Sequence, residues 1–323
     1  MSYCLNPEKP LAKELVRIAR EQIELALKDI DQSRGDIHEA VHEVRRHCKL
    51  IRGLIRLVRP SFPEYRSENM WFRDLSRTLS HTRDATASIE CLDALTARFK
   101  DLIQPGVFQP VRRSLEQRRH EIAGSLRLED RLTEARHSLY AAHWRAGDWT
   151  LDAEGYAAVG GGLGKTYNRA RNRMREARTE STPELLHEWR KRVKYHRYHM
   201  KLLAPTWPTI IGPREKECHR LTDYLGDDHD LIVLENVLLS EPDRFGDPQL
   251  FRSLSGLIHW RRAELQAAAL PLGLRLFAET REAHVKRFQG IWEASLAETP
   301  GARGLAVKNK PAAKPVLRHL SAI

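Results

Sequence analysis

The sequence predicts an all-α protein, on three observations. Apolar residues recur three or four positions apart over long stretches, for example at Leu11, Leu15 and Ile18, which is the spacing of a helix with one buried face. No stretch alternates apolar and polar residues convincingly, as a half-buried strand would. Only 18 Gly and 16 Pro interrupt a chain of 323 residues. Hydrophobic residues make up 41%, which is enough for a core and excludes global disorder.

Clusters of Gly, Pro, Ser and Asp divide the chain into helices of the length found in bundles. These breaks fall at residues 33–36, 60–63, 104–106, 147–164, 179–183, 205–213 and 241–248. After residue 298 the composition changes: residues 299–323 carry five Lys or Arg, no acidic residue and several Pro and Gly. We therefore expect a disordered basic tail there.

An internal repeat is the most informative feature of the sequence. Residues 42–60 align without gaps with residues 187–205, and seven of the nineteen positions are identical. A second pair of segments follows at nearly the same offset, Leu79-x4-Asp84 and Leu225-x4-Asp230. The repeat predicts one domain over residues 8–298 made of two homologous halves. The predicted halves are about 8–125 and 156–298, and the connector between them is 126–155.

Each of the two repeated segments carries cations along one helix face. At about 100° per residue, the cations of the first segment fall within an arc of roughly 140°, and apolar residues occupy the opposite face. The first stripe consists of His42, Arg45, Arg46, Lys49, Arg52 and Arg56, with Arg59 at its end. The second stripe consists of His187, Arg190, Lys191, Lys194, Arg197 and Lys201.

The composition of the stripes favours an anion-binding surface over an ordinary solvated face. A solvated face usually interleaves Glu with Lys to avoid repulsion, yet each 18-residue segment holds six Lys or Arg and one Glu. Arg outnumbers Lys eight to four, and the planar guanidinium chelates phosphate oxygens. Together the two segments hold a net charge of +10, against +11 for the whole chain. We therefore predict a site for an oligoanion.

A third basic helix, residues 165–178, directly precedes the second stripe. Arg169 and Arg173 share one face of it and can line the same groove from a neighbouring antiparallel helix. The other arginines of this helix, Arg171, Arg175 and Arg178, are equally well explained as solubilising residues.

Two kinds of polar residue accompany the stripes. Asp84 and Asp230 are expected to begin helices, where a carboxylate complements the helix dipole. The alternative is that they orient an arginine or lysine of the basic faces. His42 and His187 suit the rim of the site, either as neutral donors or as cations once an anion raises their pKa.

Two tempting motifs are discounted. Residues 160–166 resemble a P-loop, but Val159 stands where the motif needs glycine and no strand precedes it, so we expect a flexible entry into the next helix. Residues 227–230 (Asp-Asp-His-Asp) suggest a metal-dependent phosphohydrolase with His187 and Asp247 as further ligands, but no His-x3-His or paired-carboxylate scaffold accompanies them. No arrangement of nucleophile and base is evident either. We expect no catalytic residue, no metal and no cofactor.

The paired H-x2-R-[RK]-x2-K-x2-R motifs, each followed by an L-x4-D element, resemble the conserved histidine α-helical domain family, CHAD, over about residues 8–298. The resemblance implies two pseudo-symmetric helical bundles around a basic cavity that binds inorganic polyphosphate, and an association with polyphosphate granules. It places both stripes at the positions expected to line that cavity. Some family members carry a CYTH triphosphatase domain ahead of CHAD, but few residues precede the first helix here, so no triphosphatase activity is expected.

The function expected from sequence is therefore non-enzymatic binding of polyphosphate, and of other polyanions, between the two stripes. A nucleic-acid-binding protein is the main alternative, although neither 18-residue segment holds the Asn or Gln that base readout favours. Four widely spaced cysteines fit a reducing compartment. We find neither a signal peptide nor a run of about 18 apolar residues, so the expected location is cytoplasmic, without a membrane partner.

Overall fold

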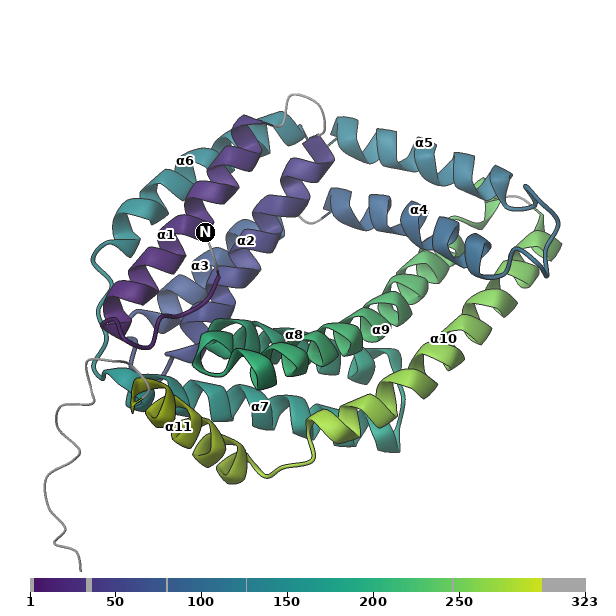
Figure 1. Ribbon diagram of the computed structural model, residues 1–323. Helices are drawn as coiled ribbons and strands as arrows, with labels where there is room; N and C mark the ends of the chain where they lie inside the picture. The colour runs from purple at the N-terminus through teal and green to yellow at the C-terminus, as the bar shows by residue number, and fades with distance from the viewer. Residues whose placement is uncertain (1–2, 33–36, 80, 126, 246, 298–323) are drawn as a thin grey trace, which may run out of the picture.

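Helices account for all the regular secondary structure of residues 3–32, 37–79, 81–125, 127–245 and 247–297, which this computed structural model describes (Figure 1). The all-α prediction is thereby confirmed. The α-helices of these residues are α1 (Leu11–Asp31), α2 (Ile37–Leu57), α3 (Tyr65–Thr78), α4 (His81–Arg98), α5 (Gln109–Ser125), α6 (Leu128–Ala146), α7 (Gly155–Thr179), α8 (Pro183–Leu203), α9 (Pro208–Ser240), α10 (Pro248–Leu276) and α11 (Arg281–Ala297). Short 3₁₀ turns at Ala204–Thr206 and Pro242–Arg244 precede and follow α9.

Local chemistry explains where the helices of the second half begin. The Thr182 hydroxyl accepts a hydrogen bond from the backbone N–H of Leu185 at 3.3 Å, and Pro183 occupies the first position of α8. In the same way, the Asp247 carboxylate accepts from the backbone N–H of Gln249 at 2.8 Å and caps α10. Asp247 is thus a helix cap.

The prediction of a flexible glycine entry into the third basic helix is wrong. The glycines of residues 160–164 lie inside α7, where they allow α7 and the end of α2 to approach closely. A Cβ atom on Gly162 would lie only 1.8 Å from the backbone oxygen of Leu57. Tertiary packing, which the sequence pattern does not show, makes glycine useful within this helix.

The break expected over residues 205–213 is narrower than predicted, because Pro213 lies within α9. Proline has a backbone φ that suits a helix, and Pro213 is only the sixth residue of α9, so the hydrogen bond that it removes and the carbonyl that its ring crowds lie near the start of the helix. The break expected at residues 33–36 and the basic tail at residues 299–323 lie outside the described residues. Most of the predicted connector is helical, since α6 falls within it and packs against α1.

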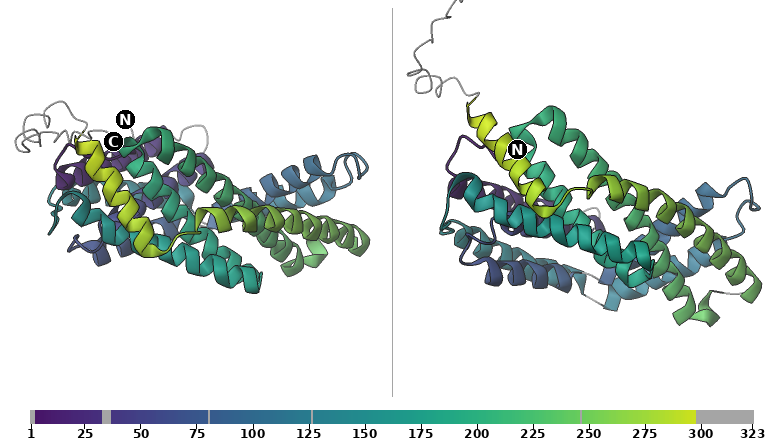
Figure 2. Two further views of the ribbon diagram at one scale, coloured as in Figure 1. Left: turned by 60° about the horizontal axis from the view of Figure 1, so that its bottom comes forward. Right: turned by 90° about the horizontal axis from the view of Figure 1, so that it is seen from below.

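Two apolar cores hold the helices together, and each draws on both predicted halves of the chain. The larger core contains α1, α2, α3, α6, α7, α8 and α11, together with the first part of α9 and the end of α10. The smaller core contains α4 and α5, together with the second part of α9 and most of α10. Figure 2 shows α4 and α5 beside α10 at one end of an elongated molecule. The cores therefore do not divide the chain at the connector, and the internal duplication stays a prediction.

The two stripe-bearing helices, α2 and α8, pack directly against each other in the larger core. Gly53 of α2 makes this contact close, since a Cβ atom there would lie 2.8 Å from the Tyr198 ring. The carbonyl oxygen of Gly53 lies 3.2 Å from Nε2 of His199. This crossing brings cations that are about 145 residues apart in the sequence onto neighbouring helices. Within the described ranges, no helix combines the length and the apolar character needed to cross a membrane.

Candidate anion-binding site

A first group of cations gathers where α2 faces α8. We call it the Lys194 cluster; it comprises Arg45 of α2 and Arg190, Lys194 and Arg197 of α8. Burial, followed by repulsion from the three arginines, lowers the pKa of Lys194 to about 8, and Asp230 of α9 only partly opposes this. With the described part of the chain, Lys194 makes no hydrogen bond and no ion pair. The cluster thus holds a partly buried ammonium without a paired anion.

The arginines of this cluster are held from behind by neighbouring helices. Arg45 donates to the carbonyl oxygen of Ser76 in α3 at 2.8 Å, and Arg197 donates to the Glu215 carboxylate in α9 at 2.8 Å. The guanidinium of Arg190 packs 3.5 Å from the position that a Cβ atom on Gly226 would take. These contacts fix the positions of the arginines, and Arg197 forms an ion pair with Glu215.

The middle of the first stripe lies over an aromatic ring of α8. The guanidinium carbons of Arg52 and Arg56 lie 5.9 and 4.2 Å from the ring centroid of Tyr195, within cation–π range. Their hydrogen-bond acceptors are neutral: Asn69 accepts from Arg52 at 3.3 Å and from Arg56 at 2.8 Å, and the Tyr65 hydroxyl accepts from Arg56 at 3.1 Å. Both guanidinium groups are therefore oriented by neutral acceptors, and neither forms an ion pair with a carboxylate of the described residues.

A second group lies where the end of α2 meets α7 and α8. We call it the Arg192 cluster; it comprises Arg56, Arg59, Arg169, Arg173 and Arg192. Burial, then repulsion from Arg169, Arg56 and Arg173, lowers the pKa of Arg192. Burial is also the main reason why the pKa of Arg59 falls to about 10, with contributions from Arg56 and Arg169. Arg59 donates to the Thr166 hydroxyl at 3.1 Å and to the carbonyl oxygen of Gly162 at 3.3 Å, which anchors it on α7.

The predicted site did not include Arg192. Its charge belongs to the second repeated segment, but its side chain leaves α8 about 160° away from that of Lys194, off the stripe. The third basic helix was the one indication in the sequence, because its residues Arg169 and Arg173, on α7, lie near Arg192 and repel it. Recognising this required knowing which face of α8 packs beside α7.

Other predicted residues lie at the margins of these clusters. Arg46 donates to the Glu43 carboxylate at 2.6 Å, and His42 lies 3.3 Å from the same side chain. Lys191 pairs with Glu188, and Arg173 pairs with Glu176. Lys49 is half-buried on α2 between Arg45 and Arg52, and Lys201 is exposed near the end of α8.

His187 meets another histidine at the edge of the site. Its Nδ1 atom lies 3.2 Å from Nδ1 of His229 on α9, and burial, aided by nearby Lys191 and Arg190, lowers the pKa of both rings. For His229 the pKa falls to about 4. The pair therefore stays largely uncharged at neutral pH in the anion-free protein.

The prediction that Asp230 begins a helix is wrong, because Asp230 lies well inside α9. The helix does not end at Gly226, because Leu225, Asp228 and Leu231 continue its buried face. The electrostatic contact between Asp230 and Lys194 matches the alternative interpretation, in which the carboxylate orients a basic residue. Asp84 lies in the first turn of α4, and its side chain is outside the described residues.

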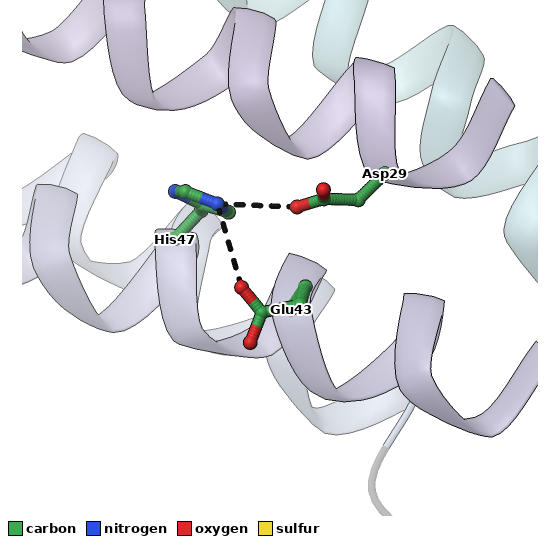
Figure 3. A group of neighbouring side chains, drawn as sticks. All are labelled: Asp29, Glu43 and His47. Carbon is green, nitrogen blue, oxygen red and sulfur yellow. Dashed lines mark ion pairs between the residues drawn. The ribbon is translucent and has the colours of Figure 1, made fainter. Parts of the chain in front are cut away.

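The acidic segment 227–230 does not converge on a metal in the described structure. Asp228 turns away to accept hydrogen bonds from Arg262 at 3.2 Å and Gln266 at 2.8 Å, while Asp247 caps α10. Figure 3 shows one of two groups of described residues whose ligand atoms lie close enough together to hold a metal, Asp29, Glu43 and His47; the other is Glu39, His42 and Glu43. His47 Nε2 lies 3.2 Å from Asp29, but Arg46 Nη2 is 3.1 Å from the same nitrogen. Arg46 already supplies a cation to this group.

Both the sequence and the fold of this chain match those of known proteins. The family model of the CHAD domain matches residues 17–239. The chain belongs to the CHAD family. A solved structure described as "PptA from Streptomyces chartreusis" is 18% identical to this CHAD protein, with a TM-score of 0.57. The match covers 84% of this chain and 100% of that one, so the two share a fold. No curated protein matches the chain.

Proposed function

We propose that this CHAD protein binds inorganic polyphosphate, without catalysing its turnover, along the cations that α2, α7 and α8 bring together. The observation that supports this most strongly is Lys194. Its pKa of about 8 reflects burial beside three arginines, and it has no hydrogen-bond or ion-pair partner among the described residues. Because burying an unpaired charge is costly, such an arrangement is stable mainly when an anion can enter it.

A phosphate chain suits this site better than a single small anion. The cations extend along α2 from Arg45 to Arg56, which are eleven residues and therefore about 17 Å apart, and continue to Arg59 just beyond the helix. Guanidinium groups donate to phosphate oxygens in a fork, and each contact releases counterions that surround a polyanion. A linear polyanion that contacts several of these groups at once gains from every contact.

Affinity measured over a series of salt concentrations tests the proposal. We expect titration calorimetry with long-chain polyphosphate to show an affinity that falls steeply as salt rises, because counterion release drives binding. Replacing Arg45, Lys49, Arg190 and Lys194 together by Ala should weaken binding at least about 100-fold, since it removes most of the Lys194 cluster. Binding that does not respond to salt, or that survives the quadruple substitution unchanged, contradicts the proposal.

Competition and turnover separate this function from the alternatives. A polyphosphate site should release labelled polyphosphate poorly to single-stranded DNA or RNA, because the stripe segments lack Asn and Gln for base readout. A site that prefers nucleic acid would favour the nucleic-acid function instead. Phosphate release in the presence of Mg²⁺ or Mn²⁺, abolished by Asp230→Ala, would indicate a phosphohydrolase.

A further inference from the structure

The cations of the candidate site form two clusters on opposite sides of α8. Lys194 and Arg192 are only two residues apart, so their side chains leave the helix about 160° apart. The first stripe has a cation near each of them. Arg45 repels the ammonium of Lys194, and Arg56 repels the guanidinium of Arg192. Arg45 and Arg56 are eleven residues apart on α2, or about 17 Å. The helix α2 therefore connects the Lys194 cluster and the Arg192 cluster, each of which attracts anions.

The stretch between the clusters remains positively charged. Arg52 and Arg56 lie over the Tyr195 ring, and their acceptors, Asn69 and the Tyr65 hydroxyl, carry no charge. Along this route on α2, neither Arg52 nor Arg56 forms an ion pair with a carboxylate of the described residues. These two guanidinium groups can therefore attract an extended polyanion between the clusters.

Two acidic residues border the Arg192 cluster, and both are accessible to water. Glu188 contacts Lys191 and Arg192, while Glu176 pairs with Arg173; their side chains are 32% and 45% exposed. Exposed ion pairs of this kind contribute only about 0–1 kcal/mol, so phosphate oxygens can replace them at small cost. Arg169 is exposed on α7 and already faces the same cluster.

We propose that the Lys194 cluster and the Arg192 cluster are two phosphate subsites for one polyphosphate chain, which runs along α2 and past Tyr195. This inference rests on the proposed function and adds a preference for chain length. A short chain fills one subsite at a time. A chain long enough to reach both makes its second contact within the same complex, and such linkage raises the overall affinity by about 10²–10⁴-fold.

The test compares tripolyphosphate with long-chain polyphosphate by titration calorimetry at one fixed salt concentration. The wild-type chain should bind two tripolyphosphates, and it should bind long-chain polyphosphate at least about 100-fold more tightly. The variant Arg169→Gln/Arg192→Gln should bind one tripolyphosphate and lose at least about tenfold in affinity for the long chain. Its dependence of affinity on salt should also become shallower, because fewer phosphates are contacted.

The matched control is Arg175→Gln/Arg178→Gln, which removes two exposed arginines from the same helix, α7, outside the Arg192 cluster. This control should keep both tripolyphosphate sites and most of the length preference. Arg169→Gln alone, at an exposed position, provides the same comparison if the double variant unfolds. A long-chain affinity that falls equally in the cluster variant and the control overturns the inference, and so does a single tripolyphosphate site in the wild type. Absence of any polyphosphate binding by the wild type overturns the proposed function itself.

Discussion

Lys194 shows how one residue can make binding depend on pH. Its pKa in the free protein is about 8, against an ordinary value near 10.4, because burial and three arginines disfavour the ammonium. A phosphate bound beside Lys194 adds negative charge, which favours the ammonium form and raises this pKa again. Anion binding above pH 8 therefore requires Lys194 to take up a proton.

We expect the affinity for polyphosphate to fall as pH rises above 8, by up to about tenfold per pH unit. Titration calorimetry between pH 7 and 9.5, in buffers of different ionisation enthalpy, measures both the affinity and the proton uptake. The variant Lys194→Arg keeps its charge across this range and should lose most of the pH dependence. If it retains the wild-type dependence, another group takes up the proton.

His196 makes a second single-residue prediction, which concerns folding. The ring is fully buried in the larger core, neither ring nitrogen has a hydrogen-bond partner in the described structure, and burial lowers its pKa well below the ordinary value. The folded state therefore keeps His196 neutral, whereas the unfolded state protonates it near pH 6.5. Its contribution to stability is complete above pH 6.5 and is lost as pH falls.

The free energy of unfolding should decrease as pH falls from 6 to 5, and His196→Phe should reduce this slope by about 1.4 kcal/mol per pH unit. Urea denaturation at several pH values measures the slope. His199 and His284, which are buried beside His196 with pKa values lowered to about 3 and 4, continue to supply the remaining slope. Identical slopes in wild type and variant would show that His196 does not titrate on unfolding.

At the scale of helices, the site depends on close approaches between α2 and its neighbours. Gly162 permits α7 to lie against the end of α2, where a Cβ atom would be 1.8 Å from the Leu57 oxygen and 2.6 Å from the Arg56 oxygen. Both contacts are with backbone, which cannot move aside as a flexible side chain can. The position of Arg56 and Arg59 relative to α7 follows from this contact.

Gly162→Ala should lower the free energy of unfolding by at least about 1–3 kcal/mol, the usual effect of overpacking. It should also weaken polyphosphate binding, because the added methyl group pushes α7 away from α2 and thereby moves Arg169 away from the rest of the Arg192 cluster. Gly256→Ala is the control: Gly256 is exposed within α10 and a Cβ atom there has no neighbour within 4 Å. It should stabilise the protein by about 1 kcal/mol, as alanine does within a helix. A Gly162 variant as stable as this control would contradict the contact.

At the scale of the whole molecule, the two cores should respond differently to ligand. The clusters lie on α2, α7 and α8 of the larger core, whereas α5 belongs to the smaller core. Saturating polyphosphate, at about 100 times its Kd, should stabilise the folded state by about 2.7 kcal/mol. Hydrogen exchange should slow most in α2 and α8 and least in α5. Uniform protection across both cores would place the ligand elsewhere or show that the cores open together.

The sequence by itself determined the helical class and the two repeated segments, and it predicts an anionic ligand. These properties follow from local periodicity and from unbalanced charge, as in the six Lys or Arg and single Glu of residues 42–59, and both can be counted along the chain. Tertiary structure decided which charges meet. Arg192 joins the site because α7 packs beside α8, and Asp230 lies within α9 because that helix packs along both α8 and α10. Gly162 fits within α7 because α2 occupies the space that a side chain would fill. Such contacts join residues far apart in the chain, so local patterns cannot predict them.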